Sequence, residues 1–198
     1  GILFDLGLSS RQSEGGGRGF TFQGDEPLDM RFDPRQELTA WDVVNSYPQE
    51  DLERIIRIYG EDYRARYIAR SIVANRPINT SLHLSQVVRR ATRRPWSRIH
   101  PATRTFQAIR IEVNEEMESL ELALRQAVPL LGPGGRLTVI SYHSLEDRLV
   151  KGFLRRESVE YGNIRLVNKK IISPSLEEVR HNPRSRSARL RVAEHVEG

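Results

Sequence analysis

The sequence contains no cysteine, which excludes disulfide bonds, thiolate chemistry and cysteine-ligated zinc. No stretch approaches the roughly 20 apolar residues that cross a bilayer, and no signal-peptide pattern is visible at the start. Its five histidines show no HExxH or paired-carboxylate spacing, so no metal site is predicted. The Lys-Ser/Thr ending of a phosphate-binding loop is also missing. We therefore expect a cytoplasmic protein without a membrane partner.

What the chain has in excess is arginine. It carries a net charge of +5 and a pI near 9.9, while its 38% hydrophobic and 29% charged residues are ordinary for a globular protein of 198 residues. One group of arginines surrounds a tryptophan, and a second crowds the C-terminal segment from Arg180 to Arg191. Guanidinium groups match phosphate geometry, and an indole offers a stacking face for an unpaired base. The first group is therefore predicted to bind RNA: Arg89, Arg90, Arg93, Arg94, Trp96 and Arg98.

Two apolar runs predict strands of an α/β sheet. The chain opens on Gly1-Ile-Leu-Phe4 and breaks at Asp5, which is typical of a central strand of a parallel sheet, covered on both faces. Because this run begins the chain without a methionine, we expect the chain to have lost its beginning. Arg136 to Ser141 reads as a second buried strand, and two weaker strands are expected near 164–167 and 188–193.

Helical periodicity fills much of the remaining chain. Helices are predicted over about 52–60, 62–75, 84–92, 117–131 and 145–155, with another opened by Pro101 and a bend or join at Asn114-Glu115-Glu116. No convincing strand falls between Arg35 and Thr105. This pattern predicts a helical domain at 35–105, inserted into an α/β core formed by 1–34 and 106–198.

Candidate site residues lie where the predicted strands end. Ligands of open α/β sheets bind beyond the carboxyl ends of the strands, where Asp5 and His143 are expected. Gln12, seven residues after Asp5, could add a hydrogen-bonding arm. Each residue also has a structural interpretation, because an acid can cap the next helix and a lone histidine is commonly a structural hydrogen bonder.

Six segments, taken in order, resemble the RsmH (MraW) family. They are Asp5-Leu-Gly-Leu-Ser-Ser10, Arg18-Gly-Phe-Thr-Phe22, Pro27-Leu-Asp-Met-Arg31, the run from His100 to Asn114, Ser141-Tyr-His-Ser-Leu-Glu-Asp-Arg148 and Asn182-Pro-Arg-Ser-Arg-Ser187. The turn Gly132-Pro-Gly-Gly135 before a buried strand also resembles Rossmann-like S-adenosylmethionine methyltransferases. The resemblance covers nearly the whole chain.

The resemblance implies a class I enzyme that uses S-adenosyl-L-methionine to methylate the exocyclic N4 of one cytidine. The target would lie in the decoding region of 16S-type ribosomal RNA, as free RNA or in the small ribosomal subunit. It also implies that the first strands of the Rossmann-like core, about 90 residues in three β–α units, are missing and that this fragment alone is inactive.

Few of the family's site residues map onto this sequence. Cofactor contacts carry over only to Asp5 and Gln12, and the candidates for contacting the target amino group are Asp5, Ser141 and His143. A rival interpretation is a non-catalytic RNA-binding protein that has lost the cofactor half. A DNA N4-cytosine methyltransferase is disfavoured, because Asp5-Leu-Gly-Leu stands where those enzymes carry an Asn/Asp-Pro-Pro-aromatic motif.

Overall fold

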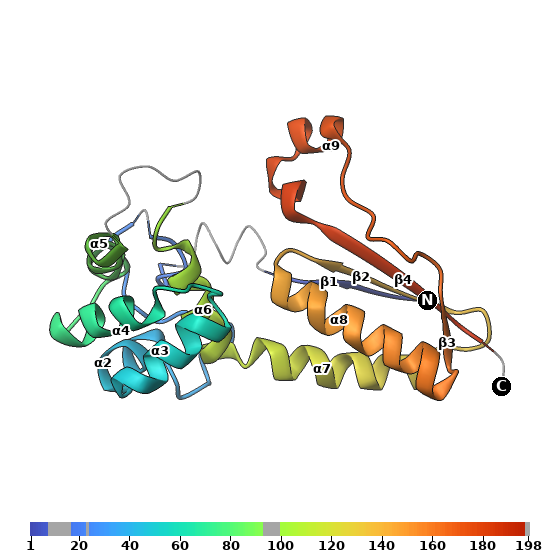
Figure 1. The fold of residues 1–198 in the computed structure, drawn as a ribbon, viewed down its shortest axis with the longest axis horizontal. Helices are drawn as coiled ribbons and strands as arrows, with labels where there is room; N and C mark the ends of the chain where they lie inside the picture. Colours follow the sequence, from blue (N-terminus) through green and yellow to red (C-terminus); the bar gives the residue numbers. More distant parts are fainter. Residues whose placement is uncertain (8–16, 23, 93–99, 197–198) are drawn as a thin grey trace. The chain divides into compact units, whose positions relative to one another are not determined.

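The computed structural model describes residues 1–7, 17–22, 24–92 and 100–196, and these residues form two compact units. One unit combines residues 1–7 with 117–198 and holds a β-sheet, and the other spans residues 8–116 and is helical (Figure 1). We call them the sheet unit and the helical unit. No helix among the described residues is both long enough and apolar enough to cross a membrane.

The sheet unit contains a four-stranded mixed sheet in the order β1-β2-β4-β3 (Figure 1). Its strands are β1 (Ile2–Asp5), β2 (Arg136–Ser141), β3 (Ile164–Leu166) and β4 (Arg189–His195). β1 runs parallel to β2, with Asp5 opposite Ile140, whereas β4 is antiparallel to both β2 and β3. The α/β class and all four predicted strands are confirmed.

Helices cover one face of this sheet. Side chains of α7 (Glu116–Ala127) and α8 (Ser144–Arg156) share a core with alternate residues of the strands, among them Leu137 and Val139 of β2. The 3-10 turn η1 (Val128–Leu130) follows α7, and the π-helical turn η2 (Glu157–Tyr161) follows α8. Beyond β3 come α9 (Leu176–His181) and the 3-10 turn η3 (Pro183–Ser187).

The predicted central position of the first strand is wrong for the described residues. β1 is an edge strand that pairs only with β2, and none of its residues is fully buried. Phe4 packs against the core, whereas Leu3 points to the other face and is 63% exposed. A short apolar run does not reveal how many strands flank it, because that number is set by tertiary structure.

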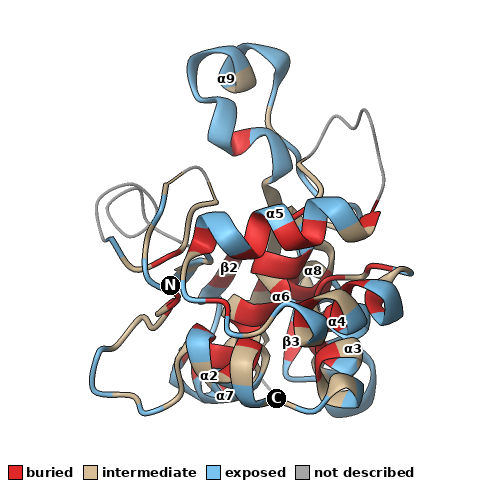
Figure 2. Cartoon of the chain, turned by 90° about the vertical axis from the view of Figure 1, so that its left-hand side faces the viewer, coloured by how far each residue is buried: buried red, intermediate tan, exposed pale blue. Residues whose placement is uncertain are grey.

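Five helices of the helical unit surround one hydrophobic core, and their buried residues face inward (Figure 2). They are α2 (Ala40–Ser46), α3 (Gln49–Ile58), α4 (Ala65–Ala74), α5 (Ser81–Thr92) and α6 (Thr103–Asn114). All but α2 were predicted. The seven-residue α2 is too short to show a clear period, but Thr39 and Asp42 form a capping box at its start.

The join predicted near residue 115 is confirmed. α6 ends at Asn114, Glu115 adopts a left-handed backbone with φ 47°, and α7 begins at Glu116. Asn114 is buried and donates from its amide to the carbonyl oxygens of Met30 and Arg110, while its Oδ1 accepts from the Phe32 N–H. This side chain therefore fixes the loop before α2 to the end of α6.

Two of the resembling segments build that loop. Arg18 donates to the carbonyl oxygen of Arg31, and the backbone N–H of Gly19 donates to Glu26. At φ +78°, Gly19 lies so close to Pro27 that a Cβ would stand 2.3 Å from the Pro27 carbonyl oxygen. Only glycine fits there.

Candidate functional site

Asp5 and Tyr142 meet at the edge where β1 and β2 end. Because the two strands are parallel, their carboxyl ends lie together, as predicted from the sequence. The Leu6 N–H donates to the Ile140 carbonyl oxygen over 3.0 Å, which extends the pairing past Asp5. The phenol of Tyr142 then donates a 2.8 Å hydrogen bond to Asp5 Oδ1.

Tyr142 is held in this position by its surroundings. Its ring packs over Gly7, where a Cβ would lie in van der Waals contact, 3.4 Å from Tyr142 Cδ2, and where the φ of +100° favours glycine. Burial first, and then the hydrogen bond and negative charge of Asp5, raise the pKa of Tyr142 to about 12. The phenol therefore remains a neutral hydrogen-bond donor over the whole physiological pH range.

Ser141, the last residue of β2, is on the opposite side of the strand from this pair. It is 2% exposed, and its hydroxyl donates to the carbonyl oxygen of Arg189 over 3.4 Å. Since side chains alternate along a strand, Ser141 shares the helix-covered face with Val139. Asp5 pairs with Ile140 and lies on the other face.

His143 is the N-cap of α8. Its Nδ1 accepts a 3.3 Å hydrogen bond from the Glu146 N–H, and the Glu146 carboxylate accepts from the N–H groups of Tyr142 and His143. The His143 Nε2 lies 3.1 Å from Glu146 Oε1, without the geometry of a hydrogen bond. In this structure the imidazole is therefore turned toward the start of α8.

Glu146 is the anion of this capping box. Burial opposes its ionisation, but the His143 ring and the N–H donors of Tyr142 and His143 outweigh burial, and the pKa of Glu146 is lowered. The carboxylate stays charged at neutral pH and stabilises the positive end of the helix dipole. The box thereby fixes the backbone that carries Tyr142.

Ion pairs join the start of α8 to β4. Asp147 accepts a 2.7 Å hydrogen bond from Arg191 Nε, and Arg189 lies 3.4 Å from its second oxygen. The Asp147 and Arg191 side chains are only 14% and 12% exposed. Two arginines at the start of β4, Arg189 and Arg191, thus help to hold the sheet unit together.

Sequence reasoning identified Asp5 but missed its partner. Tyr142, Glu146 and Asp147 were quoted within the segment Ser141–Arg148 without a role. For Glu146 a local signal existed, because a polar N-cap followed three residues later by Glu is the spacing of a capping box. No local signal pairs Tyr142 with a residue 137 positions away.

The edge presents an anionic, hydrogen-bonding surface. Asp5 is exposed, and within the described part of the chain its Oδ2 makes no hydrogen bond. Such an oxygen can accept a hydrogen bond from an amino group or lie against a positive charge. Tyr142 orients the carboxylate without neutralising it.

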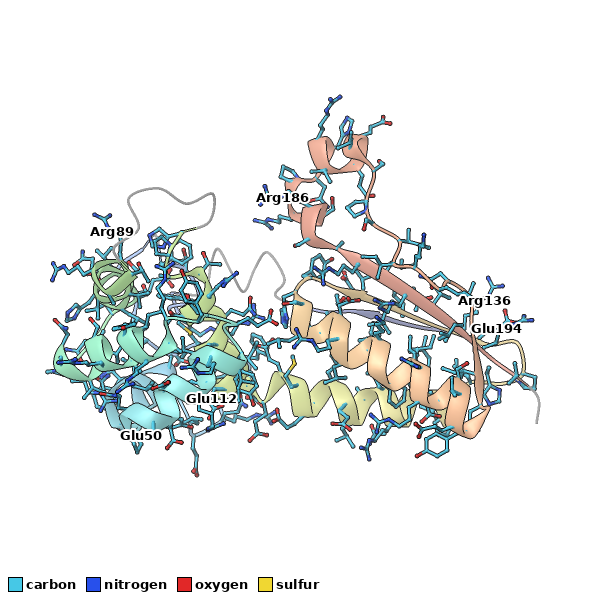
Figure 3. The ribbon with its side chains drawn as sticks, in the orientation of Figure 1. Glu50, Arg89, Glu112, Arg136, Arg186 and Glu194 are labelled. Carbon is cyan, nitrogen blue, oxygen red and sulfur yellow. The ribbon has the colours of Figure 1, made fainter. Side chains whose placement is uncertain are left out.

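Many of the other predicted site residues lie outside the described residues: Gln12, Arg93, Arg94, Trp96 and Arg98. Arg89 and Arg90 are described, at the end of α5, and both are exposed (Figure 3 labels Arg89). Among the described residues neither guanidinium forms an ion pair or a hydrogen bond. They are therefore available to a ligand.

Comparison with known proteins identifies the class. The model of the MraW methylase family matches residues 1–196. The chain is 51% identical to the Ribosomal RNA small subunit methyltransferase H of Dehalococcoides mccartyi strain BAV1, over 99% of this chain and 60% of that protein. The proteins of the same name from Thermotoga neapolitana and Thermomicrobium roseum are 54% and 50% identical, over 100% and 99% of this chain.

The chain belongs to the MraW methylase family, also known as RsmH. It spans between 60% and 66% of the length of these three relatives. The resemblance drawn from six short segments is thereby confirmed.

Proposed function

We propose that this chain belongs to a class I methyltransferase that modifies the N4 of a specific cytidine in the decoding region of 16S-type ribosomal RNA. The family match and the names of the relatives support methylation of small-subunit ribosomal RNA. The substrate is the RNA itself or the small subunit, and the protein acts in the cytoplasm with S-adenosyl-L-methionine as cofactor.

One observation of the structure carries this proposal: a carboxylate oriented by a neutral phenol at the shared carboxyl end of two parallel strands. This is the edge at which open α/β sheets bind ligands. Asp5 would serve both the cofactor and the target base, because it is exposed and keeps one oxygen free among the described residues.

The Asp5 carboxylate fits the cofactor by charge. S-adenosylmethionine carries a positive sulfonium and a protonated amine, and when bound it supplies an electrophilic methyl group. Asp5 would hold this cationic end, and Gln12 would add an uncharged arm. Tyr142 would keep the Asp5 carboxylate in one orientation before the cofactor arrives, which favours catalysis by positioning.

The cytosine amino group needs help from its surroundings. Its lone pair is delocalised into the ring, and its nitrogen must release one proton as the new N–C bond forms. Asp5 would accept a hydrogen bond from this N–H, favour a pyramidal nitrogen and take up the proton. Ser141 and His143 would act as positioning residues here, since Ser141 is buried and His143 caps α8.

The domain roles follow from the same proposal. The sheet unit, 1–7 with 117–198, would belong to a methyltransferase core with Rossmann-like topology, and the helical unit, 8–116, would hold the inserted domain for RNA recognition. The boundaries expected from the sequence, 34/35 and 105/106, both fall inside the helical unit, the second of them within α6. Arg89, Arg90, Arg93, Arg94, Trp96 and Arg98 would supply phosphate contacts and a stacking face. The side chains of Arg89 and Arg90, which are exposed and have no ion pair with another described residue, support this role.

A methyl-transfer assay tests the proposal. The full product of the gene is incubated with radiolabelled S-adenosylmethionine and either small ribosomal subunits, naked ribosomal RNA or duplex DNA. We expect label at cytidine N4 in one of the ribosomal substrates, about a 100-fold loss of rate in Asp5→Asn, and a smaller loss in Tyr142→Phe. Unlabelled RNA that is nevertheless bound would favour the non-catalytic alternative, and an unaffected Asp5→Asn enzyme would contradict the role of Asp5.

A further inference from the structure

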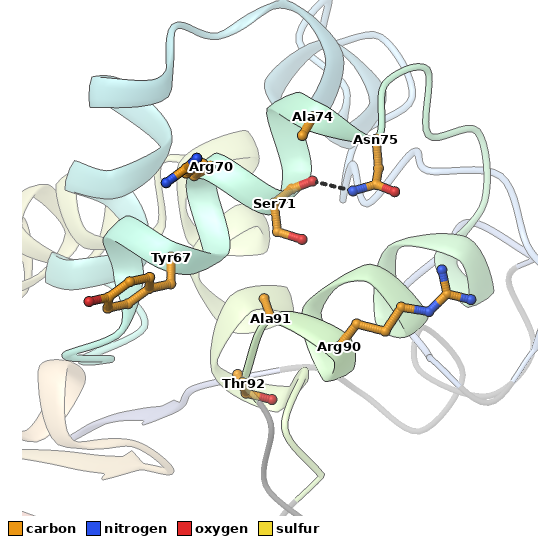
Figure 4. A pocket seen from close by; sticks show the side chains of 8 residues that line it. All are labelled: Tyr67, Arg70, Ser71, Ala74, Asn75, Arg90, Ala91 and Thr92. Carbon is orange, nitrogen blue, oxygen red and sulfur yellow. Dashed lines mark hydrogen bonds between the residues drawn. The ribbon is translucent and has the colours of Figure 1, made fainter.

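The helical unit contains a groove between α4 and α5. None of the residues that line this groove belongs to the proposed catalytic edge of the sheet. Its volume is about 630 Å³ (Figure 4). Helices α4 and α5 pack against each other beneath it. It is lined by Tyr67, Arg70, Ser71, Ala74, Asn75, Arg90, Ala91 and Thr92.

The charged residues that line this groove are both arginines, and they come from a segment without acidic residues. From Tyr63 to Ile111 the sequence contains eleven arginines and no aspartate or glutamate, whereas the remaining residues hold more acidic than basic side chains. Arg70 and Arg90 lie on the two helices that form the groove. Among the described residues neither guanidinium has an acidic partner or a hydrogen bond.

An aromatic ring also lines the groove. Tyr67 is 68% exposed, far more than is usual for a tyrosine that serves a core. Ala74 and Ala91 leave space in the lining because their side chains are single methyl groups. A flat apolar ligand could therefore lie against the Tyr67 ring.

Two polar groups in the groove remain available for hydrogen bonds. The Asn75 amide nitrogen donates to the backbone oxygen of Ser71 (Figure 4), which leaves Asn75 Oδ1 as an acceptor. The Ser71 hydroxyl makes no hydrogen bond with another described residue. Together they offer a donor and acceptors that could contact the edge of a base.

We propose that this groove holds one unstacked nucleotide of single-stranded RNA outside the methylation target. The base stacks on Tyr67, its edge faces Ser71 and Asn75, and the phosphates on either side contact Arg70 and Arg90. An acidic peptide would satisfy the arginines but would leave the exposed ring without a function. The inference rests on the proposed function, because it names where a second part of the same RNA is held.

Binding to matched oligonucleotides tests the stacking contact. Fluorescence anisotropy compares a labelled oligouridylate with an abasic oligomer of the same length, each titrated with the full chain. We expect Tyr67→Ala to weaken oligouridylate binding about tenfold and to leave binding of the abasic oligomer unchanged. Tyr67→Phe keeps the ring and should bind as the wild type does. Equal losses for both oligomers, or a Phe variant as weak as the Ala variant, would overturn the proposal.

The phosphate contacts are tested against a neighbouring arginine of the same helix. Arg66 is exposed on α4 but does not line the groove. We expect Arg70→Ala and Arg90→Ala each to weaken oligouridylate binding roughly fivefold, and Arg66→Ala to have a clearly smaller effect. Equal effects at all three positions would overturn a defined site in favour of a diffuse basic surface.

Two further measurements separate the alternatives. An oligoglutamate peptide that binds as tightly as the RNA, with the same dependence on Arg70 and Arg90 and none on Tyr67, would overturn the choice of RNA. The anisotropy assay measures RNA binding and requires no methyl transfer. If the protein transfers no methyl group but its RNA binding still depends on the groove residues, the RNA-binding role of the groove is supported and only the proposed function is contradicted.

Discussion

Arginine has opposite roles in two regions of this molecule. At the sheet, Arg191 pairs with Asp147, and Arg136 and Arg165 both pair with Glu194, whose pKa these two guanidinium groups lower (Figure 3 shows Arg136 beside Glu194). At α4 and α5, Arg70 and Arg90 have no acidic partner among the described residues. Paired arginines contribute to the fold, whereas unpaired arginines of this density raise the affinity for an anionic ligand.

This difference explains why the net charge of the chain is a poor predictor of where it binds an anionic ligand. The chain's +5 charge is modest, yet it averages a segment with no acidic residue and a remainder in which acids exceed bases. Self-repulsion among unpaired cations costs stability. A surface of unpaired arginines favours the binding of anionic ligands, and the local partner of each arginine is more informative than the total charge.

Removing the paired Arg191 should give the largest effect on stability. Arg191→Ala leaves the Asp147 carboxylate largely buried with only the more distant Arg189, so we expect the contact between α8 and β4 to lose about 2 kcal/mol or more. Hydrogen exchange of the α8 and β4 amides measures this loss. Arg136→Ala is the matched control, because Arg136 is 61% exposed and Arg165 still pairs with Glu194. Equal protection from hydrogen exchange in the two variants would contradict the expected difference between a buried and an exposed arginine pair.

Removing unpaired arginines should instead weaken binding without a loss of stability. We expect Arg89→Ala combined with Arg90→Ala to reduce the slope of log affinity for single-stranded RNA against log salt by about 1.4, with no decrease in the free energy of unfolding in urea. The control removes the same charge from the sheet unit, as Arg136→Ala with Arg165→Ala, and should retain the slope. If both double variants flatten the slope equally, RNA does not distinguish paired from unpaired arginines.

Glu146 extends the comparison to a pairing that depends on pH. Its pKa is lowered by folding, so its carboxylate stabilises the folded chain above the ordinary value of 4.5, and that contribution is lost as the pH falls through the folded pKa. We expect Glu146→Gln to cost about 1 kcal/mol at neutral pH and to show a flatter stability profile in acid. Urea unfolding followed by circular dichroism at neutral and acidic pH measures both. A wild type that becomes more stable on acidification would show that burial, which favours the protonated acid, dominates.

The sequence predicted local structure well because local structure depends on nearby residues. The strand from Arg136 to Ser141 was predicted with its observed bounds, and the two strands that precede Asp5 and His143 are parallel, as expected. Contacts between distant residues were not predictable in this way. Three features depend on tertiary arrangement: the strand register that brings Tyr142 to Asp5, the antiparallel pairing of β4 with β2, and the Arg191–Asp147 ion pair.

The Asp5–Tyr142 pair gives the smallest but most specific prediction. Burial is the largest cause of the raised pKa of Tyr142 and Asp5 the next, so Asp5→Asn should lower that pKa from about 12 while keeping it above the ordinary 10. Tyrosinate absorbance after a rapid pH jump, with Tyr142→Phe subtracted to remove the other tyrosines, measures the shift before the chain unfolds. The sign is fixed because a nearby anion disfavours a second anion. An unchanged titration in Asp5→Asn would mean that the carboxylate does not contact the phenol, and the sheet edge would then lose the oriented acid on which its proposed chemistry depends.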